Sequence, residues 1–570
     1  MDTGFAHSDV TSAELLDDLR MIIGASHVIT NPKSMQRFCK GYRSGEGKAL
    51  AVVRPGTLLE QWKVLKACVE ADKIVIFQAS NTGLTEGSTP KETYDRDAVV
   101  VSTSRIDDIH LLRDGEQIIS LPGGRLFELE KQLRPFGRQP HSVIGSTTIG
   151  ASIIGGICNN AGGSLIERGV SYTELALYAQ VDAMGQLQLV NHLDIDLGND
   201  PETILTRLQN RDYTKADIKT SDRKACDTEY REHIRKVDEP TPSRFNADPR
   251  RLYEAAGSAG KLAIFAVRLD TYPKADNEQT FYIGTNSKEA LTKLRRDVLG
   301  GFENLPVSAE YVHANLYDVA KRYGKDTLVL IDKLGTDRLP ALFALKGWLD
   351  ARLNAVPILP KNLIDHIMQG LSALWPNMLP KKMEDFRKRY EHHLILKMRD
   401  SGIEEATDYL QEHLSGDNGD WFACTLREGQ IASLHRFAAA GAAIRYEAVH
   451  TSKISGLVAL DVALRRNEED WFDDLPQEIE DALVHKLYCG HFMCHVFHND
   501  YLVKKGYDTK AIKKKLLEIF EKRGAQYPAE HNVGHVYEAK PALADFYKKC
   551  DPTNTLNPGL GKTSRKRNYA

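Results

Sequence analysis

The chain has 570 residues, of which 42% are hydrophobic and 27% charged, and its formal net charge is −3. These proportions are typical of a globular protein and exclude extended disorder, while the length exceeds what one hydrophobic core usually serves, so we expect several domains. The near-neutral charge gives no indication of a nucleic-acid partner, and the eight cysteines, without a C-x-x-C pair, predict reduced thiols rather than disulfides.

From residue 49 the chain alternates apolar runs with segments of helical periodicity. The runs 49–55 and 73–78 flank a segment, 58–69, in which apolar residues recur at helical spacing, and this order predicts a β-α-β unit. Further apolar runs and an amphipathic helix expected over 126–133 continue a rhythm that is typical of an α/β domain.

The pattern changes beyond residue 270, so we place a domain boundary near 270–280. The elements expected after it are a strand over 280–286, a helix capped by Ser287, a helix over 430–440 that ends at Gly441, a strand over 442–449 and a helix over 509–523. Short strands with isolated helices are typical of an antiparallel α+β cap.

Residues 340–390 combine prolines, large apolar side chains and basic clusters. Between Lys321 and Asp400 there are 15 basic and 9 acidic residues, so positive charge is concentrated here. Each Lys or Arg near an anionic leaflet contributes about 1 kcal/mol, and Trp348, Leu371 and Trp375 are candidates to reach the headgroup region. The alternative is a solvated basic helical subdomain. No apolar run approaches the roughly 18 to 20 residues of a spanning helix, and the N-terminus lacks a secretory signal, so the cytoplasm is the default compartment.

Two glycine-bearing loops carry the strongest functional signal. The first covers residues 78–88 (Q-A-S-N-T-G-L-T-E-G-S) and the second residues 141–164. Glycines let a backbone approach a ligand closely, and successive N–H groups in a turn form a concave anion site, so we expect these loops to hold a pyrophosphate and a large flat group. Ordinary surface loops are the alternative. No G-x-G-x-x-G follows a strand and no intact P-loop is present, which disfavours a Rossmann or kinase-type site.

The two loops, together with G-S-A-G-K-L-A-I at 257–264, resemble the FAD-binding domain of the vanillyl-alcohol-oxidase/p-cresol-methylhydroxylase superfamily. Nearly the whole chain, from A-L-A-V-V-R-P-G to D-P-T-N-T-L-N-P-G-L-G-K-T-S, resembles the bacterial quinone-dependent D-lactate dehydrogenases, which are membrane-associated flavoenzymes. The resemblance implies an α+β fold with a discontinuous FAD-binding domain of the p-cresol-methylhydroxylase (PCMH) type, an antiparallel α+β cap domain and a basic helical membrane-binding insertion.

The same resemblance implies domain bounds and cofactor contacts. The expected divisions are an FAD-binding domain at 1–270 with a C-terminal return at 522–570, a cap at 271–312 and 390–521, and a basic membrane-binding insertion at 313–389. The residues expected to bind FAD are Ala79, Ser80, Asn81, Thr82, Gly83, Gly87 and Ser88 at the pyrophosphate, and Gly145, Ser152, Gly162 and Ile264 along the rest of the cofactor.

Histidines supply the second functional signal. They gather in two segments of the C-terminal region, at His485, His491, His495, His498, His531 and His535. A histidine titrates near neutrality, so it can accept the hydroxyl proton of a 2-hydroxy acid while hydride leaves for a flavin. Spacings of four residues could also hold a metal ion.

The resemblance selects among these histidines. It points to His491 and His498 in G-H-F-M-C-H-V-F-H, and to Glu530 and His531 in E-H-N-V-G-H. Either His531 or His491 is the expected base. The Asp-Gly-Asn part of the related motif is missing, so no metal site is predicted.

A hydroxy acid also needs a partner for its carboxylate, and a guanidinium binds one through two parallel hydrogen bonds. Arg465 and Arg466 in A-L-R-R-N-E-E-D-W are the candidates that the resemblance favours, with Arg445 a weaker one. Surface salt bridges are the alternative role for each.

The resemblance thus implies FAD-dependent oxidation of D-lactate to pyruvate, with electrons passing to quinone. The expected partners are D-lactate, quinone and an anionic membrane surface, without nucleic acid, and the expected location is the cytoplasmic face of the inner membrane. Two alternatives remain: the same fold acting on glycolate or D-2-hydroxyglutarate with another acceptor, and a membrane-binding flavoprotein without turnover.

Overall fold

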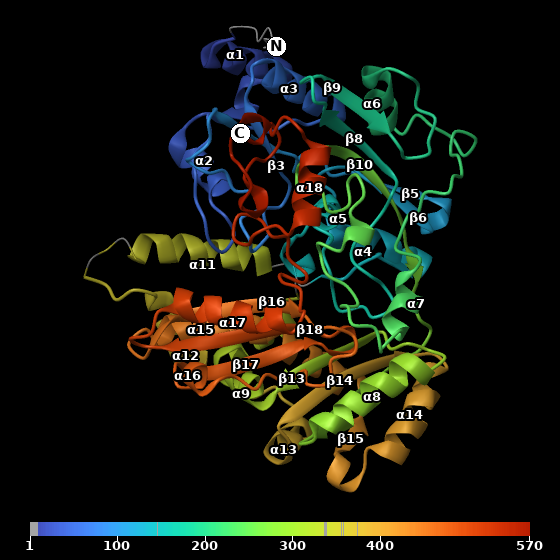
Figure 1. Cartoon of the computed structure of the whole chain (residues 1–570), viewed down its shortest axis with the longest axis vertical. Helices are drawn as coiled ribbons and strands as arrows, with labels where there is room; N and C mark the ends of the chain where they lie inside the picture. The colour runs from blue at the N-terminus through green and yellow to red at the C-terminus, as the bar shows by residue number, and fades with distance from the viewer. Residues whose placement is uncertain (1–9, 145, 336–338, 355, 357, 373) are drawn as a thin grey trace.

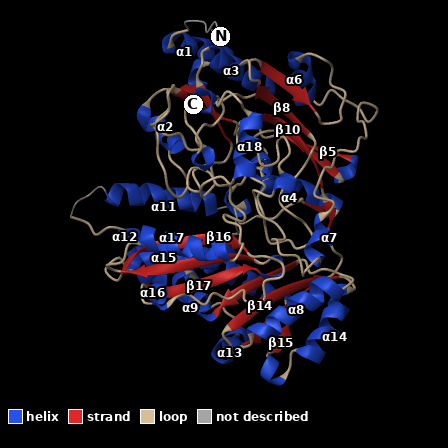
Figure 2. Cartoon of the chain, in the orientation of Figure 1, coloured by secondary structure: helices blue, strands red, loops and turns tan. Residues whose placement is uncertain are grey.

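Three main β-sheets and the helices around them make up the protein (Figures 1 and 2). The structure is a computed structural model and describes residues 10–144, 146–335, 339–354, 356, 358–372 and 374–570. Two of the sheets lie in the upper half of Figure 1 and the third in the lower half. The α+β class expected from the sequence is confirmed.

The first sheet has four strands in the order β1-β2-β4-β3. Its strands are β1 (Val28–Ile29), β2 (Ala51–Val53), β4 (Ala98–Ser102) and β3 (Ile74–Gln78). Both β2 and β3 pair in parallel with β4, so the β-α-β unit predicted from the sequence is confirmed, with β4 inserted between its strands. The connecting helix α3 (Leu58–Glu70) begins where the Thr57 side chain accepts from the Glu60 backbone N–H.

The second sheet has five antiparallel strands in the order β5-β6-β10-β8-β9. Its strands are β5 (Ile109–Leu112), β6 (Gln117–Ser120), β10 (Ala263–Asp270), β8 (Ala176–Val181) and β9 (Leu187–Asn191). The helices of this N-terminal half are α1 (Ser12–Ile23), α2 (Pro32–Cys39), α4 (Leu126–Leu133), α5 (Ile153–Cys158), α6 (Pro201–Gln209) and α7 (Tyr230–Arg235). A separate, short antiparallel pair is formed by β7 (Arg138–Gln139) and β11 (Tyr272–Pro273).

The C-terminal segment lies beside the first sheet. Leu556 forms a parallel bridge with Val75 of β3, and the Asn557 backbone N–H donates to the Val75 carbonyl at 3.0 Å. Helix α18 (Pro541–Cys550) and the chain end accordingly lie in the upper half of Figure 1, near the N-terminal helices.

The third sheet has seven antiparallel strands in the order β15-β12-β14-β13-β17-β18-β16. Its strands are β15 (Asp420–Ala423), β12 (Glu278–Thr285), β14 (His392–Arg399), β13 (Ser308–His313), β17 (Leu483–His491), β18 (Val496–Lys504) and β16 (Ile454–Ala463). Register places Glu310 of β13 opposite His491, and Asp461 of β16 opposite His498. Cross-strand pairing therefore brings two carboxylates to two histidines.

Helices cover both faces of the third sheet, since successive side chains of a strand point to opposite faces. Phe281 and Ile283 belong to the core that contains α8 and α14, whereas Tyr282 belongs to the core that contains α9 and α15. The helices here are α8 (Lys288–Gly301), α14 (Gly402–His413), α15 (Leu426–Val449), α16 (Gln477–Glu480) and α17 (Thr509–Lys522). The expected Ser287 cap of α8 is confirmed, because its hydroxyl accepts from the Ala290 N–H at 3.0 Å.

The prediction that a helix ends at Gly441 and a strand follows was wrong. Helix α15 begins at a Thr425 capping box and continues through Gly441 to Val449. Gly441 is exposed, and nothing lies within 4 Å of a Cβ placed there, so nothing around Gly441 requires the helix to end at this residue. Ala442, Ala443 and Tyr446 continue the buried face at helical spacing.

Five helices lie between β13 and β14 in the sequence and form a helical insertion. They are α9 (Ala314–Tyr323), α10 (Lys325–Leu334), α11 (Leu339–Asn354), α12 (Leu363–Ser372) and α13 (Lys381–Arg389). Within the described ranges, no helix is both long and apolar enough to cross a bilayer. The exact domain bounds given above stay predictions.

Candidate active site

The first glycine loop follows the carboxyl end of β3, and side-chain hydrogen bonds fix its backbone. The Gln78 amide donates to the Ser88 carbonyl, and the Asn81 amide donates to the Lys40 carbonyl. Asn81 takes a left-handed φ of 50°, which turns the backbone so that neighbouring N–H groups face one side. Among the described residues, no acceptor lies within hydrogen-bond reach of the backbone N–H groups of Ser80–Gly83.

These orphan donors fit the diphosphate of FAD. A Cβ placed on Gly83 would meet nothing within 4 Å, so the space beside the loop is open. Ser80, Asn81 and Thr82 are half-buried and Gly83 is exposed, so their N–H groups are open to a ligand, and an anion is the partner that such a concave turn binds best. The side chains of Asn81 and Ser88 hydrogen-bond to one another at 3.1 Å and so brace the loop.

The second loop meets a candidate catalytic residue directly. A Cβ on Gly162 would lie 2.6 Å from Glu530 Oε1, so only glycine lets the Glu530 side chain approach. Arg244 fixes the same region, because its Nη2 lies 3.0 Å from Glu530 Oε1 and also donates to the Gly163 carbonyl.

Two of the remaining predicted cofactor residues, Ser152 and Ile264, make structural contacts within the protein. Ser152 caps α5, since its Oγ accepts from the Gly155 N–H at 3.0 Å. Ile264 is buried in β10, and its carbonyl accepts from the Gln61 amide. Gly145 lies outside the described residues.

C-terminal residues join the two candidate sites. The Asn557 amide donates to the Gly87 carbonyl at 2.7 Å and to the Ala259 carbonyl at 2.9 Å. The E-H-N-V-G-H segment packs on the first loop, because a Cβ on Gly534 would lie 1.9 Å from the Thr85 carbonyl oxygen. The candidate catalytic residues therefore lie at the edge of the candidate cofactor site.

Three of the six histidines gather around three carboxylates. His491 Nδ1 lies 2.6 Å from Glu310 Oε1, and His491 Nε2 lies 3.2 Å from Glu530 Oε2. His498 Nε2 lies 3.5 Å from His491 Nε2. His531 Nδ1 lies 2.7 Å from Asp461 Oδ2. These six residues form the histidine–carboxylate cluster.

Charge within the cluster is divided unequally. Burial alone would lower the pKa of His491, but the carboxylates of Glu310 and Glu530 outweigh it and raise the pKa to about 10. Burial lowers the pKa of His498 to about 4, which leaves this ring neutral. Burial opposes charge at His531 too, yet Asp461 outweighs it and raises the pKa of that ring above its ordinary value.

The Glu530 and Asp461 carboxyl groups titrate in the opposite sense. Burial would raise the pKa of Glu530, but the charge of His491 holds it well below its usual range. Asp461 likewise has a lowered pKa, because His531 offsets its burial. Asp461 Oδ2 also accepts the backbone N–H groups of Glu530 and His531, which fixes this turn against β16.

Sequence reasoning missed four members of this network: Arg244, Glu310, Arg436 and Asp461. Glu310 pairs with Arg436 at 3.1 Å as well as with His491. Asp461 and Glu310 stand inside apolar strand runs, and an acidic residue in such a run is a signal that could have found them. Nothing in the sequence around Arg244 or Arg436 singles them out.

The structure does not bring the predicted arginines to the cluster. Arg465 pairs with Glu468 at 3.2 Å, and Arg466 donates to the Thr241 carbonyl and hydroxyl. Arg445 binds two buried aspartates of the helical insertion. These guanidinium groups are therefore occupied elsewhere.

The other three histidines also lie apart from the cluster. His485 packs edge-on against the Tyr446 ring. His495 and His535 each direct Nδ1 to a backbone carbonyl oxygen, at 3.1 Å in both cases. Their spacing of four from His491 and His531 therefore does not assemble a site.

No metal is expected from the sequence, but the cluster includes a set of possible ligands. His491, His498 and Glu530 each offer one ligand atom, and these atoms lie within 4.8 Å of one another. Two imidazoles with one carboxylate are a donor set that suits divalent transition metals.

Comparisons with known proteins agree with this geometry. Residues 280–569 match the family model described as D-lactate dehydrogenase, membrane binding, and residues 49–188 match the one described as FAD binding domain. The quinone-dependent D-lactate dehydrogenase of Escherichia coli (strain K12) is 55% identical over 97% of both chains. That of Haemophilus influenzae is 55% identical over 98% of this chain and 99% of its own, and that of Corynebacterium glutamicum is 44% identical over 98% of both.

Solved structures share the fold at low identity. The p-cresol methylhydroxylase structure with substrate bound aligns with a TM-score of 0.58 at 12% identity over 96% of both chains. The 4-ethylphenol oxidase from Gulosibacter chungangensis aligns with a TM-score of 0.56 at 11% identity over 98% of both.

Fold and site together define an FAD-dependent oxidoreductase with the p-cresol methylhydroxylase type of fold. Within that class, the near full-length identity is specific. The chain belongs to the family of quinone-dependent D-lactate dehydrogenases.

Proposed function

We propose that this protein oxidises D-lactate to pyruvate, with FAD as cofactor and quinone as electron acceptor. Two close contacts carry the proposal: Gly162 of the second glycine loop approaches Glu530, and Gly534 approaches Thr85 of the first glycine loop. These contacts join the diphosphate-binding loop to a proton-accepting cluster. When bound, FAD supplies an acceptor for the substrate hydride and passes the electrons on to quinone.

In this mechanism His531 accepts the hydroxyl proton of the substrate. Its Nδ1–H donates to Asp461, which leaves the Nε2 lone pair free to act as base. The side chain is 33% exposed, so a substrate can reach it. His491 is less suited to this role, because both of its ring nitrogens already face carboxylates, Glu310 and Glu530.

Two cationic side chains, those of His491 and Arg43, would hold the substrate. The His491 imidazolium, positioned by Glu310, places positive charge beside the reacting oxygen. Arg43 is exposed on the loop between α2 and β2. Its positive charge acts to lower the pKa of both His531 and Tyr537. We assign the substrate carboxylate to Arg43, because the arginines selected from sequence are occupied elsewhere.

Anaerobic mixing with a panel of 2-hydroxy acids tests the activity. We expect D-lactate to bleach the flavin absorbance and to release pyruvate, and a quinone analogue to restore the colour. Reduction by glycolate or D-2-hydroxyglutarate but not by D-lactate would assign another substrate. No reduction by any acid would refute the enzymatic function.

We also propose that the helical insertion contacts an anionic membrane surface, at the cytoplasmic face of the inner membrane. Large apolar side chains are exposed there, including Ile358 at 93% and Leu374 at 82%. Leu371 is 52% exposed, Trp375 is half-buried, and the Trp348 side chain lies outside the described residues. Apolar side chains beside basic clusters are typical of peripheral membrane binding.

Vesicle sedimentation tests this contact. We expect the protein to sediment with anionic vesicles, less so as salt rises, because added ions screen exposed charges. Equal binding to neutral and anionic vesicles would contradict an electrostatic contact.

A further inference from the structure

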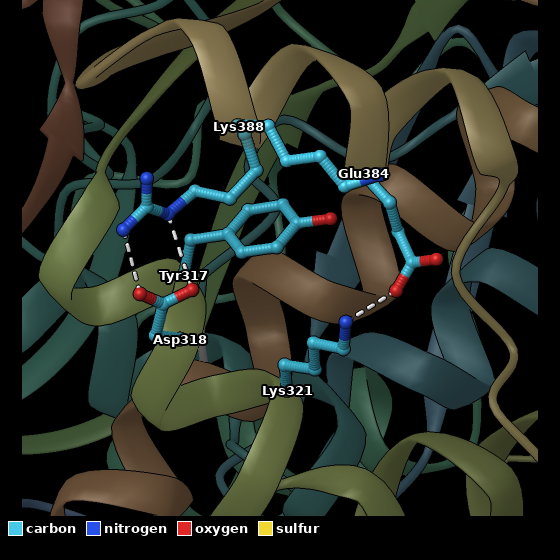
Figure 3. Close-up of a pocket in the computed structure, with 6 residues that line it drawn as sticks. Tyr317, Asp318, Lys321, Glu384 and Lys388 are labelled. Carbon is cyan, nitrogen blue, oxygen red and sulfur yellow. Dashed lines mark hydrogen bonds and ion pairs between the residues drawn. The ribbon is translucent and has the colours of Figure 1, made fainter.

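A second polar pocket lies in the helical insertion, between α9 and α13 (Figure 3). Its volume is about 330 Å³. The residues that line it are Tyr317, Asp318, Lys321, Glu384, Arg387 and Lys388. None of them belongs to the histidine–carboxylate cluster, so the pocket is separate from the active site.

The Tyr317 hydroxyl is the unusual group in this pocket. The side chain is only 1% exposed, yet the hydroxyl has no hydrogen-bond partner among the described residues. In Figure 3 the ring lies across the pocket and the hydroxyl points toward the side where Glu384 and Lys321 lie. A buried hydroxyl without a partner costs about 1 to 3 kcal/mol, so it is a natural donor for a ligand.

The charged residues around Tyr317 are arranged in pairs. Arg387 binds Asp318 through two hydrogen bonds, of 3.1 and 2.6 Å, and Lys321 pairs with Glu384. Lys388 is 73% exposed, and its partner Asp385 is not part of the pocket lining. Three cations and two carboxylates thus line the pocket, and the third cation, Lys388, has its carboxylate partner outside the lining.

The pocket is joined to the exposed apolar end of α12. The Asn377 amide donates to Glu384 Oε1 at 2.8 Å, and Asn377 follows Leu374 by three residues. Leu371 and Leu374, on the same stretch of chain, are 52% and 82% exposed. A ligand with a charged head and apolar chains could therefore contact both parts.

We propose that this pocket binds the phosphodiester headgroup of a membrane phospholipid. The Tyr317 hydroxyl donates to a phosphate oxygen, and Lys388 and Lys321 oppose the phosphate charge. Asp318 and Glu384 accept hydrogen bonds from the hydroxyl or amine groups of the headgroup. The proposal rests on the membrane contact proposed above and adds a defined lipid site to a contact otherwise based on general charge.

Calorimetric titration of the full-length, FAD-loaded protein with glycerophosphoglycerol, a headgroup without acyl chains, tests the site. We expect saturable binding, weakened about tenfold by Tyr317→Phe and by Lys388→Gln. Lys381→Gln is the matched control, because it removes the same charge from the same helix outside the pocket and should bind as the native protein does. Absence of saturable binding, or equal loss in the control, would overturn the site.

Melting temperature separates a lost contact from a damaged fold. Tyr317→Phe removes a hydroxyl that has no partner in the described structure, so its melting temperature should equal or exceed the native value. A melting temperature well below the native value would mean that the hydroxyl stabilises the fold, and would overturn its assignment as a ligand donor.

Two further arms identify the source of the phosphate and separate this inference from the membrane contact. Binding of inorganic phosphate as tight as that of glycerophosphoglycerol would overturn the lipid assignment. Sedimentation with anionic vesicles by a protein that does not bind the headgroup would refute the pocket and leave the membrane contact standing. Failure to sediment with vesicles would refute the membrane contact itself, and the lipid assignment with it.

Discussion

Asp461 Oδ2 and His531 Nδ1 lie 2.7 Å apart, although 70 residues separate them in the sequence. The carboxylate holds the ring in one tautomer, with its free nitrogen directed away from β16. Asp461 does not need to touch substrate to act in this way, so we regard it as a positioning residue for the base.

Asp461→Asn should lower kcat by about 10² to 10⁴, because an amide can hold the ring in the wrong tautomer and cannot stabilise an imidazolium. Stopped-flow reduction of the bound flavin by D-lactate measures the effect. Asp473→Asn is the control, since Asp473 is an equally buried carboxylate that binds Tyr501 and Arg523 instead. Equal losses in the two variants would indicate general damage to the cap rather than a role at His531.

Arg43→Gln should raise KM for D-lactate about tenfold or more, with a smaller change in kcat, because it removes a charge that binds the carboxylate before chemistry. Steady-state kinetics measure both constants. Arg465→Gln provides the comparison, because Arg465 pairs with Glu468 away from the cluster. A larger KM effect in Arg465→Gln would restore the assignment made from sequence.

Gly83→Val should weaken FAD binding at least about tenfold and leave the cofactor-free protein as stable as the native one. The added side chain meets no protein atom within 4 Å of its Cβ, so it obstructs only what binds beside the loop. Fluorescence titration of cofactor-free protein with FAD measures the affinity. Gly300→Val in α8 also faces open space and should bind FAD normally. Unchanged affinity in Gly83→Val would place the diphosphate elsewhere.

Lys261 predicts a pH dependence of stability. Its ammonium donates to Asn554 Oδ1, and burial lowers the pKa from 10.5 to about 8. Between these values the unfolded chain binds more protons than the native protein, so stability rises with pH across that window and the burial cost of the charge is largest below pH 8.

The stability of Lys261→Met relative to the native protein should therefore fall as the pH rises from about 8 toward 10, because the native protein loses its buried charge over that range. Thermal unfolding of both proteins across this range measures the difference. The same change at Lys66, which is 58% exposed on α3, should show no such trend. A difference that does not vary with pH would mean that Lys261 keeps its ordinary pKa in the native protein.

Local features of this fold were readable from the sequence. The β2-α3-β3 unit and the cap of α8 follow from periodicity and from a single serine, because those interactions span only a few residues. The extent of α15 was not, because Gly441 resembles a helix end, and only the buried residues beyond it show that the helix continues.

The candidate site was likewise predicted only in part. His491, His498, Glu530 and His531 were named from short motifs, and each of them has a partner that no motif contains. Arg244 lies 286 residues from Glu530, and Glu310 lies 181 residues from His491. The first pair joins two loops and the second joins two strands of the third sheet, and periodicity determines neither arrangement. The two predicted arginines failed to reach the cluster for the same reason.

The two hydrogen bonds of the Asn557 amide tie the first loop to the residues before β10 from a position near the chain end. During synthesis on a ribosome, the first loop thus lacks this support until Asn557 has been added to the chain. A message truncated upstream of Asn557 should therefore yield a polypeptide that retains its yellow colour poorly.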